Sequence, residues 1–108
     1  MKDLARAVAE FNAARNWGQY HDPKNLSMAL ASEAGELCHL FRWVSSDQAD
    51  AQASALREHV EDEVADVQIL LFALAERCGI DLEEVVRTKL DRNHERYLVA
   101  EVDRGSIR

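Results

Sequence analysis

Apolar residues recur along most of this chain at the spacing of a helix. The clearest example has apolar side chains every three or four positions, so that they share one side of a helix: Leu26, Leu30, Leu37, Leu40 and Val44. The same spacing predicts helices over residues 2–16, 23–43, 51–78 and 82–98. The chain has only four glycines and one proline, which also favours long helices over turn-rich β structure. We therefore expect an all-α fold, a bundle of four helices.

The predicted helix ends carry residues that are typical of caps. Asp22 and Pro23 are suited to begin the second helix, as its N-cap and its first helical residue. Gly79 fits the position just past the end of the third helix. Asp81, with Glu84 three residues later, resembles a capping box at the start of the fourth helix.

The size of the chain predicts one domain that needs a partner. We expect residues 1–108 to form this single domain, with 101–108 as a frayed polar tail. Residues 69–75 are apolar nearly all round the third helix, and a helix that is apolar on every side is buried on every side. In so short a chain this pattern predicts an oligomer, whose contacts complete the core.

One acid interrupts the apolar stripe of the second helix. Glu33 falls in the middle of the stripe, and Glu36 lies at its edge one turn later. A carboxylate in a core is unfavourable unless it is paired with a cation or bound to a metal. The alternatives are therefore an arginine partner for Glu33 within the core, or a functional site.

The third helix repeats this arrangement. Glu63 borders the stripe formed by Val60, Val64 and Val67, and Asp66 lies slightly further round on the same side. Residues three apart are neighbours on a helix surface, so two packed helices can bring two such pairs of acids around one point. Four carboxylates repel one another unless hard cations separate them, and Mg²⁺ prefers oxygen ligands that it shares with substrate phosphates. A magnesium site is therefore predicted, with ordinary solvated surface acids as the alternative.

The fourth helix and the segment before the second helix offer groups that complement such a site. The apolar face of the fourth helix continues into three polar residues that suit phosphate oxygens, Lys89, Asn93 and Arg96. Aromatic side chains that can stack on a nucleobase flank the second helix, with His21 beside them; they are Trp17, Tyr20 and Trp43. The alternatives are a helix end that emerges into water, and aromatic residues that only fill the core.

Charge and composition exclude several classes of partner. The formal net charge of −7 argues against binding a nucleic-acid polymer or an anionic membrane surface. No apolar stretch is long enough to span a membrane, and the N-terminus lacks the apolar region of a signal peptide. We therefore expect a cytoplasmic protein, with Cys38 and Cys78 as buried thiols rather than a disulfide.

Four ordered blocks of sequence, taken together, resemble a known family. They are RNWGQYHDPKNL at residues 15–26, SEAGEL with LFRW at 32–43, EVADV at 63–67 and KLDRNHERY at 89–97. The chain is similar here to the MazG-like nucleoside triphosphate pyrophosphohydrolases, an all-α superfamily, and most of all to their small dCTP pyrophosphatase branch. The resemblance covers about residues 10–97.

This resemblance implies a function and an assembly. The family cleaves a nucleoside triphosphate at the α–β phosphoanhydride, giving the monophosphate and pyrophosphate. It implies that Mg²⁺, for which Mn²⁺ can substitute, is bound by Glu33, Glu36, Glu63 and Asp66. It also implies a homo-oligomer with sites at subunit contacts, a tetramer first and a dimer second.

The resemblance further implies roles for individual residues. Phosphate or sugar contacts fall to Lys89, Asn93, Arg96, Lys24 and Asn25, and the base pocket to Trp17, His21 and Trp43. Among the acids, Glu36 is our first choice for orienting or deprotonating the attacking water, and Glu33 is the second. The dCTP branch tends to have an aromatic residue where this chain has Leu70, which bears on base preference rather than on chemistry.

Two other functions fit parts of the sequence. A di-iron carboxylate bundle uses two Glu-x-x-His motifs, of which Glu36 and His39 supply one, but no histidine follows Glu63 in the same way. A non-catalytic helical module that oligomerises or binds a partner also fits the amphipathic helices, although it leaves Glu33 unexplained.

Overall fold

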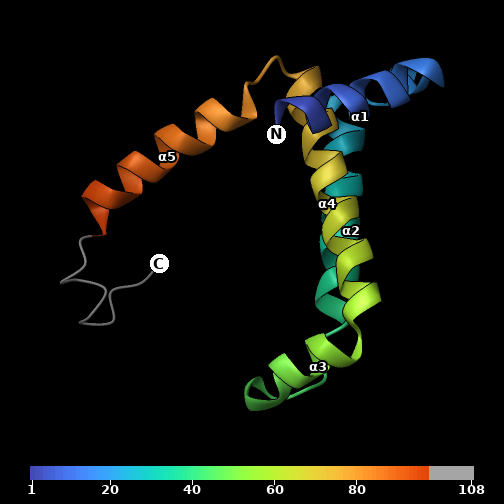
Figure 1. Ribbon diagram of the computed structural model, residues 1–108. Helices are drawn as coiled ribbons and strands as arrows, with labels where there is room; N and C mark the ends of the chain where they lie inside the picture. The colour runs from blue at the N-terminus through green and yellow to red at the C-terminus, as the bar shows by residue number, and fades with distance from the viewer. Residues whose placement is uncertain (98–108) are drawn as a thin grey trace.

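The computed structural model describes residues 1–97, and every regular element within them is helical (Figure 1). The α-helices and two short 3₁₀ helices, η1 and η2, are α1 (Lys2–Ala14), η1 (Trp17–Gln19), α2 (Pro23–His39), η2 (Ser46–Gln48), α3 (Ala49–Ala55), α4 (Arg57–Arg77) and α5 (Leu82–Arg96). The all-α class is confirmed. The described part has five α-helices rather than the expected four, because the predicted third helix is divided in two.

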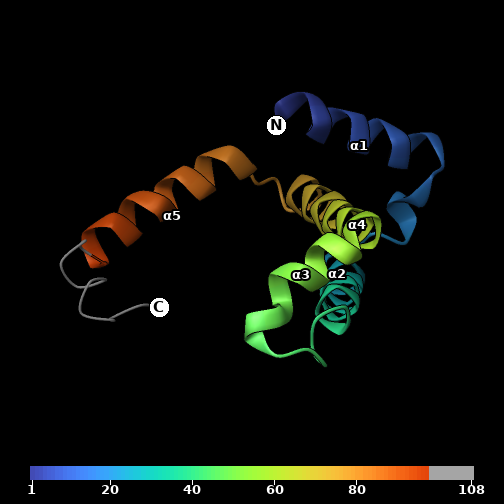
Figure 2. The same ribbon diagram turned by 60° about the horizontal axis from the view of Figure 1, so that its bottom comes forward.

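Helices α2 and α4 form the centre of the molecule. They lie side by side and run in opposite directions, while α1 crosses their upper end and packs on α4 (Figures 1 and 2). The most deeply buried side chain is Leu26 at the start of α2, which is 2% exposed. Phe72, Ala73 and Ala75 near the end of α4 are also buried, so the core lies at this end of the pair.

The start of α2 follows the predicted cap. The Asp22 side chain accepts a hydrogen bond from the backbone N–H of Asn25 at 2.8 Å, and Pro23 occupies the first turn. The predicted apolar stripe faces α4, since its members after Leu26 are all half-buried. The helix ends at His39, four residues before the expected end, and the chain continues through hydrogen-bonded turns to Val44.

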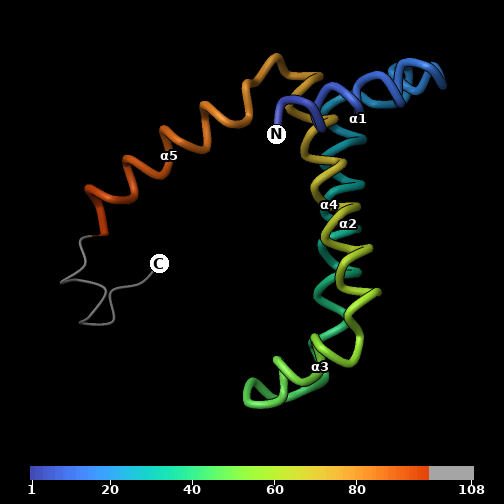
Figure 3. The backbone as a smooth tube through the Cα atoms, in the orientation of Figure 1, coloured from blue at the N-terminus to red at the C-terminus, as the bar shows by residue number. Residues whose placement is uncertain are grey.

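The predicted helix over residues 51–78 is broken at Leu56. The backbone there adopts φ −108° and ψ 30°, so α3 folds across the lower end of the α2–α4 pair before α4 begins (Figure 3). The Gln52 side chain in α3 donates a hydrogen bond to the Leu40 carbonyl at 2.9 Å. This contact satisfies a carbonyl just past the end of α2. No glycine or proline marks the break, which depends on contacts between elements.

The end of α4 is a Schellman motif. The N–H groups of Gly79 and Ile80 donate to the carbonyls of Glu76 and Ala75, at 3.2 and 2.8 Å. Gly79 has a φ of +66°, a left-handed conformation that glycine adopts without strain. The sequence therefore predicted this helix end correctly.

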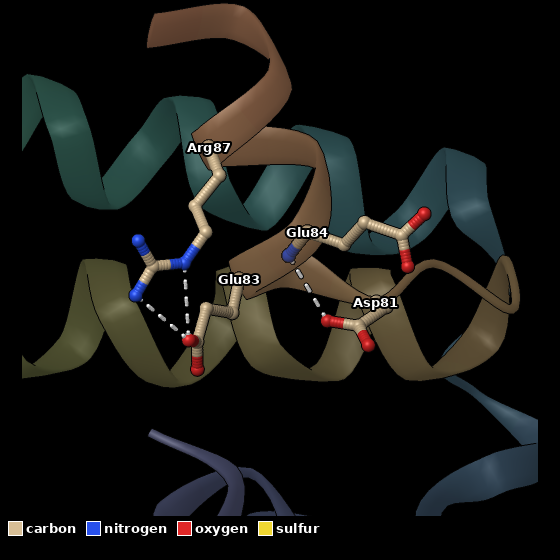
Figure 4. A network of polar contacts seen from close by, with 4 residues as sticks. All are labelled: Asp81, Glu83, Glu84 and Arg87. Carbon is tan, nitrogen blue, oxygen red and sulfur yellow. Dashed lines mark hydrogen bonds and ion pairs between the residues drawn. The ribbon is translucent and has the colours of Figure 1, made fainter. Parts of the chain in front are cut away.

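The chain then turns into α5, whose first turn is held by polar contacts (Figure 4). The Asp81 side chain accepts a hydrogen bond from the Glu84 N–H at 3.1 Å, as the capping pattern predicted. One turn further on, Arg87 forms an ion pair with Glu83 at 3.2 Å. These contacts stabilise the first turn because acidic groups are favourable at a helix N-terminus.

Helix α5 extends away from the α2–α4 pair (Figures 1 and 2). We expected its apolar face, formed by Leu82, Val85 and Val86, to point inward. For the single chain this is wrong for Val85 and Val86, which are 45% and 48% exposed, whereas Leu82 is half-buried. The expected end of this helix at residue 98 and the expected tail at 101–108 lie outside the described residues. That residues 1–108 form a single domain stays a prediction.

Two further expectations concern the cysteines and the membrane. Cys38 and Cys78 are free thiols, but both are exposed in the single chain rather than buried, because each lies on the outer side of its helix or just past the helix end. Within residues 1–97, no helix combines the length and the apolar character that crossing a bilayer requires.

Leu26 provides a test of this core. We expect Leu26→Ala to lower the free energy of unfolding by about 2–5 kcal/mol, because it leaves a cavity at the most buried position. Ser32→Ala, on the exposed side of the same helix, should change it by less than about 0.5 kcal/mol. Urea unfolding followed by circular dichroism gives both values. Equal effects of the two substitutions would contradict the core described above.

Candidate functional site

The α2–α4 pair brings acids from both helices onto its inner side. On α2, Glu33 is half-buried within the leucine stripe, as predicted. On α4 the inner side carries Glu63, which is half-buried like Val60 and Val67. Val64, which we expected on this inner side, is instead 51% exposed. The helix is therefore rotated so that Glu63, rather than Val64, faces α2.

Three carboxylates meet between the two helices. Glu33, Glu63 and Asp66 each offer an oxygen, and these three oxygens lie within 4.8 Å of one another. Asp66 is exposed, whereas the other two are half-buried. One oxygen of Glu63, Oε2, is buried and has no hydrogen-bond partner in the structure. The cluster is thus open to solvent on one side and closed on the other.

No arginine or lysine neutralises this cluster within residues 1–97. The ion pairs formed there join Arg57 to Glu61 and Arg87 to Glu83, and both lie on exposed helix surfaces. The alternative in which a core arginine pairs with Glu33 is therefore not what the described part of the chain adopts. Three acids at this spacing repel one another unless a proton or a cation reduces their charge.

The electrostatics of Glu63 reflect this crowding. Burial of the carboxyl raises the pKa of Glu63 above its ordinary value. The neighbouring Glu33 carboxylate raises this pKa further, and Asp66 and Glu36 add smaller repulsions. A raised pKa in a cluster of acids is a common mark of a functional site.

Glu36 lies beside this cluster and is not part of it. It is exposed on the next turn of α2, and its charge acts on Glu63. The expected convergence of four acids is therefore seen for three of them, with the fourth at the rim. An exposed carboxylate at the rim remains free to contact a water or a substrate group.

The chemistry of this donor set suits a hard divalent cation. Its members are all carboxylate oxygens, which Mg²⁺ prefers, and an oxygen cluster with an open side leaves room for water and phosphate ligands. His39, which the di-iron alternative needs, does not belong to the cluster and is exposed. The described residues therefore favour an all-oxygen site.

The expected phosphate-binding residues of α5 do not reach this cluster in the same chain. Lys89, Asn93 and Arg96 all lie on α5, which extends away from α2 and α4 (Figures 1 and 2). Asp66 lies about 16 Å along α4 from its end at Arg77, and Lys89 lies about 10 Å along α5 from its start at Leu82. Within one chain these groups are separate.

The expected base-binding residues are also divided. The rings of Trp17 and His21 lie near each other, with centroids 6.0 Å apart, just before α2 begins. Trp43 lies past the other end of α2 and is 78% exposed, with the Arg42 guanidinium 4.8 Å from its ring centroid. The 17 residues of α2 span about 25 Å, so one chain does not bring the three together.

Two further candidates occupy the first turn of α2. Lys24 is exposed there, about 14 Å along the helix from Glu33. The Asn25 side chain donates hydrogen bonds to the Tyr20 carbonyl and to the Asp22 carboxylate, both at 3.1 Å. Asn25 therefore holds the loop before α2 together, and neither residue lies at the acidic cluster of its own chain.

Sequence reasoning missed the role of Arg77. Its guanidinium donates hydrogen bonds to the carbonyls of Gly18 and His21, at 2.8 and 3.3 Å. From the sequence alone, Arg77 is recognisable only as a cation at a helix C-terminus, where positive charge is generally favourable. Its partners lie more than fifty residues earlier in the chain, and no local pattern could have indicated them.

The sequence matches known proteins over most of its length. Residues 28–106 match the MazG-like family. The dCTP pyrophosphatase 1 proteins of Mus musculus and Bos taurus are each 44% identical over 108 residues, and these alignments cover 98% of this chain and 63% of each relative. The Homo sapiens protein of the same name is 43% identical, with 90% of this chain and 58% of that protein covered. The chain thus spans less than two thirds of the length of these relatives.

A solved structure shares the fold. The crystal structure of a pyrophosphatase from Archaeoglobus fulgidus superposes with a TM-score of 0.86 at 35% identity, and covers 91% of this chain and 92% of that one. A helix of 15 residues is too long to lie wholly outside such an alignment, so the likeness extends into α5. Sequence and fold agree, and the chain belongs to the MazG-like family.

Proposed function

We propose that this chain hydrolyses a nucleoside or deoxynucleoside triphosphate at the α–β phosphoanhydride, releasing the monophosphate and pyrophosphate. The observation that carries the proposal is the cluster of Glu33, Glu63 and Asp66, which no cation balances within residues 1–97. Membership in the MazG-like family and the similarity to the dCTP pyrophosphatase 1 proteins favour a dCTP-like or non-canonical nucleotide.

The three clustered carboxylates are proposed to hold Mg²⁺, with Mn²⁺ as a substitute. When bound, the metal supplies positive charge to the phosphate oxygens and lowers the pKa of a water ligand. The chain's own part is to hold the oxygens of Glu33, Glu63 and Asp66 at short mutual distance on two packed helices. The buried side of the cluster limits the approach of water to one direction.

Glu36 is the proposed base. It is exposed at the rim, and its carboxylate can take a proton from the attacking water as the new bond from water oxygen to phosphorus forms. The bond between phosphorus and the bridging oxygen breaks, and pyrophosphate leaves with the electrons of that bond. Glu33 is second choice for this role, because it already faces Glu63 across the helix pair.

The remaining groups are proposed to come from a second copy of the chain. Lys89, Asn93 and Arg96 suit the phosphates and sugar, but α5 carries them away from the acids of its own chain. The apolar residues on α5 are about half exposed, which fits a helix that a partner covers. We propose a homo-oligomer, a tetramer first and a dimer second, in which α5 of one subunit completes a site on another.

The same arrangement accounts for the aromatic residues. Trp17 and His21 of one subunit and Trp43 of another can flank one nucleobase, although they lie at opposite ends of α2 within a chain. Base stacking contributes about 1–3 kcal/mol per base. Lys24 and Asn25 accompany Trp17 and His21, and their proposed phosphate contacts follow the same division between subunits.

The first prediction concerns stability and pH. Because the folded protein keeps the proton on Glu63 at pH values where the unfolded chain has lost it, the stability of the metal-free protein falls as pH rises from the ordinary pKa through the raised one. Glu63→Gln should therefore raise the metal-free melting temperature at about pH 7 and have little effect at about pH 4. Differential scanning fluorimetry measures both.

The same measurement with metal separates this effect from a general one. Mg²⁺ should stabilise the original protein and fail to stabilise Glu63→Gln, since binding to the folded state alone raises stability. Glu58→Gln, an exposed acid on the same helix, is the matched control and should leave both responses unchanged. Stabilisation of Glu63→Gln by Mg²⁺ to the full extent would contradict the proposed metal site.

The second prediction concerns activity. With Mg²⁺ and a panel of nucleoside triphosphates, the protein should release pyrophosphate and no orthophosphate, and chelation should stop the reaction. Glu63→Gln should reduce the rate by at least about 100-fold while helix content, followed by circular dichroism, stays the same. Glu58→Gln again serves as the control. Orthophosphate as the first product would end the assignment to cleavage at the α–β bond. No hydrolysis of any nucleotide would leave the non-catalytic module.

The third prediction concerns the shared site. Glu63→Gln and Lys89→Met should each be nearly inactive alone, yet subunit exchange between them should restore about a quarter of the original activity. In an equal mixture, half of the acid sets and half of the lysines are unaltered. Random pairing therefore gives about a quarter of the sites both an intact acid set from one chain and an intact lysine from another. If the mixture stays as inactive as its components although mass spectrometry shows mixed oligomers, Lys89 acts within its own chain and the proposed division is wrong.

A further inference from the structure

The loop between α1 and α2 is held mainly by contacts within itself and with α1. Tyr20 and His21 donate backbone hydrogen bonds to Trp17 and Gly18, at 2.8 and 3.3 Å. The Trp17 ring meets Phe11 of α1 edge-on, with centroids 5.5 Å apart. These contacts set the shape of the loop. The Asn25 side chain of α2 adds a hydrogen bond to the Tyr20 carbonyl. Because α1 and α2 both pack on α4, these contacts tie the loop to α4 only through other helices.

Between this loop and α4 there is a hollow. A cavity of about 270 Å³ is lined by residues of α1, the loop and the end of α4, among them Asn12, Gly18, His21, Ala73 and Arg77. Side chains do not fill this space, so packing alone does not hold the loop against α4. A direct contact across this hollow therefore adds to what holds the loop in one position.

Arg77 provides that contact. Its Nη1 atom carries two hydrogens, and it donates to the carbonyls of Gly18 and His21, at 2.8 and 3.3 Å. These two carbonyls lie three residues apart, so by binding both of them Arg77 holds the short turn that contains Tyr20. Among residues 1–97, no other side chain of α4 donates a hydrogen bond to this loop.

We infer that Arg77 is a positioning residue, which fixes the Trp17–His21 loop against α4 and thereby sets the position of the base-stacking side chains relative to the acidic cluster. Arg77 ends the same uninterrupted helix that carries Glu63 and Asp66. Arg77 therefore connects the loop directly to the helix that carries two of the three clustered acids. This inference rests on the proposed function for its kinetic consequence, but not for its structural one.

The chain offers a matched control for this inference. Arg57 begins α4 as Arg77 ends it, and its guanidinium only pairs with Glu61 on the exposed surface of the same helix, at 2.8 Å. Arg57→Met and Arg77→Met remove the same group from the same helix. Arg77→Lys keeps the charge and the donors, but its ammonium sits on a flexible stem and lacks the planar, preorganised geometry of the guanidinium, so it should hold the two carbonyls less firmly.

The structural readout is the fluorescence of Trp17. The chain has two tryptophans, so Trp43→Phe leaves Trp17 as the only one. In this background Arg77→Met should raise the acrylamide quenching constant of Trp17 about two-fold, because the loop is released from α4. Arg77→Lys should give an intermediate value and Arg57→Met none. Each protein is measured well below its melting temperature, with its helix content confirmed.

The kinetic readout uses the chain with both tryptophans. Arg77→Met should raise KM for the best nucleotide about ten-fold and change kcat less than about three-fold, since it misplaces a binding group and leaves the acids intact. Arg77→Lys should recover part of the affinity, whereas Arg57→Met should match the original protein.

Several results would overturn the inference. They are an unchanged Trp17 quenching constant in folded Arg77→Met, or a loss of kcat with an unchanged KM. If Arg77→Met does not fold, Arg77→Lys decides by the same two measurements, and original values in both would overturn the inference equally. If the original protein hydrolyses no nucleotide, the proposed function has failed while the fluorescence result still shows whether Arg77 holds the loop.

Discussion

The main physical constraint in this structure is repulsion between carboxylates that are held at short distance. Packing of α2 on α4 is driven by apolar side chains such as Leu26, yet it brings Glu33, Glu63 and Asp66 within 4.8 Å of one another. Apolar contacts between the two helices therefore stabilise an arrangement that repulsion between the three acids destabilises. A divalent cation would replace this repulsion with attraction, so the same arrangement suits the metal proposed above.

The sequence predicted the parts of the fold that depend on neighbours along the chain. The stripe that contains Glu33, the cap at Asp22 and the helix end at Gly79 all follow from residues within one or two turns, and all were correct. The pairing of acids across α2 and α4 could be predicted as well, because on each helix an acid falls on or beside the apolar stripe. Two local patterns were thus enough to predict that Glu63 lies near Glu33.

Other features depend on contacts between distant segments and had no local signal. The break at Leu56 has no glycine or proline and goes with a hydrogen bond from Gln52 to a carbonyl near the end of α2. The exposure of Val64 follows from a small rotation of α4, which a helical pattern does not fix. The direction of α5 could not be predicted from its apolar face, because such a face indicates burial without naming what covers it.

The Schellman motif at Gly79 bears on the proposed association of two copies. The direction in which the chain leaves α4 is set by a left-handed backbone and two hydrogen bonds within one turn. A Cβ atom at this position would meet no atom beyond the adjacent residues within 4 Å, so the preference for glycine there is conformational. In the proposed oligomer each copy would therefore present α5 already oriented before association. Docking of such preformed surfaces loses less conformational entropy than folding upon contact, which strengthens association.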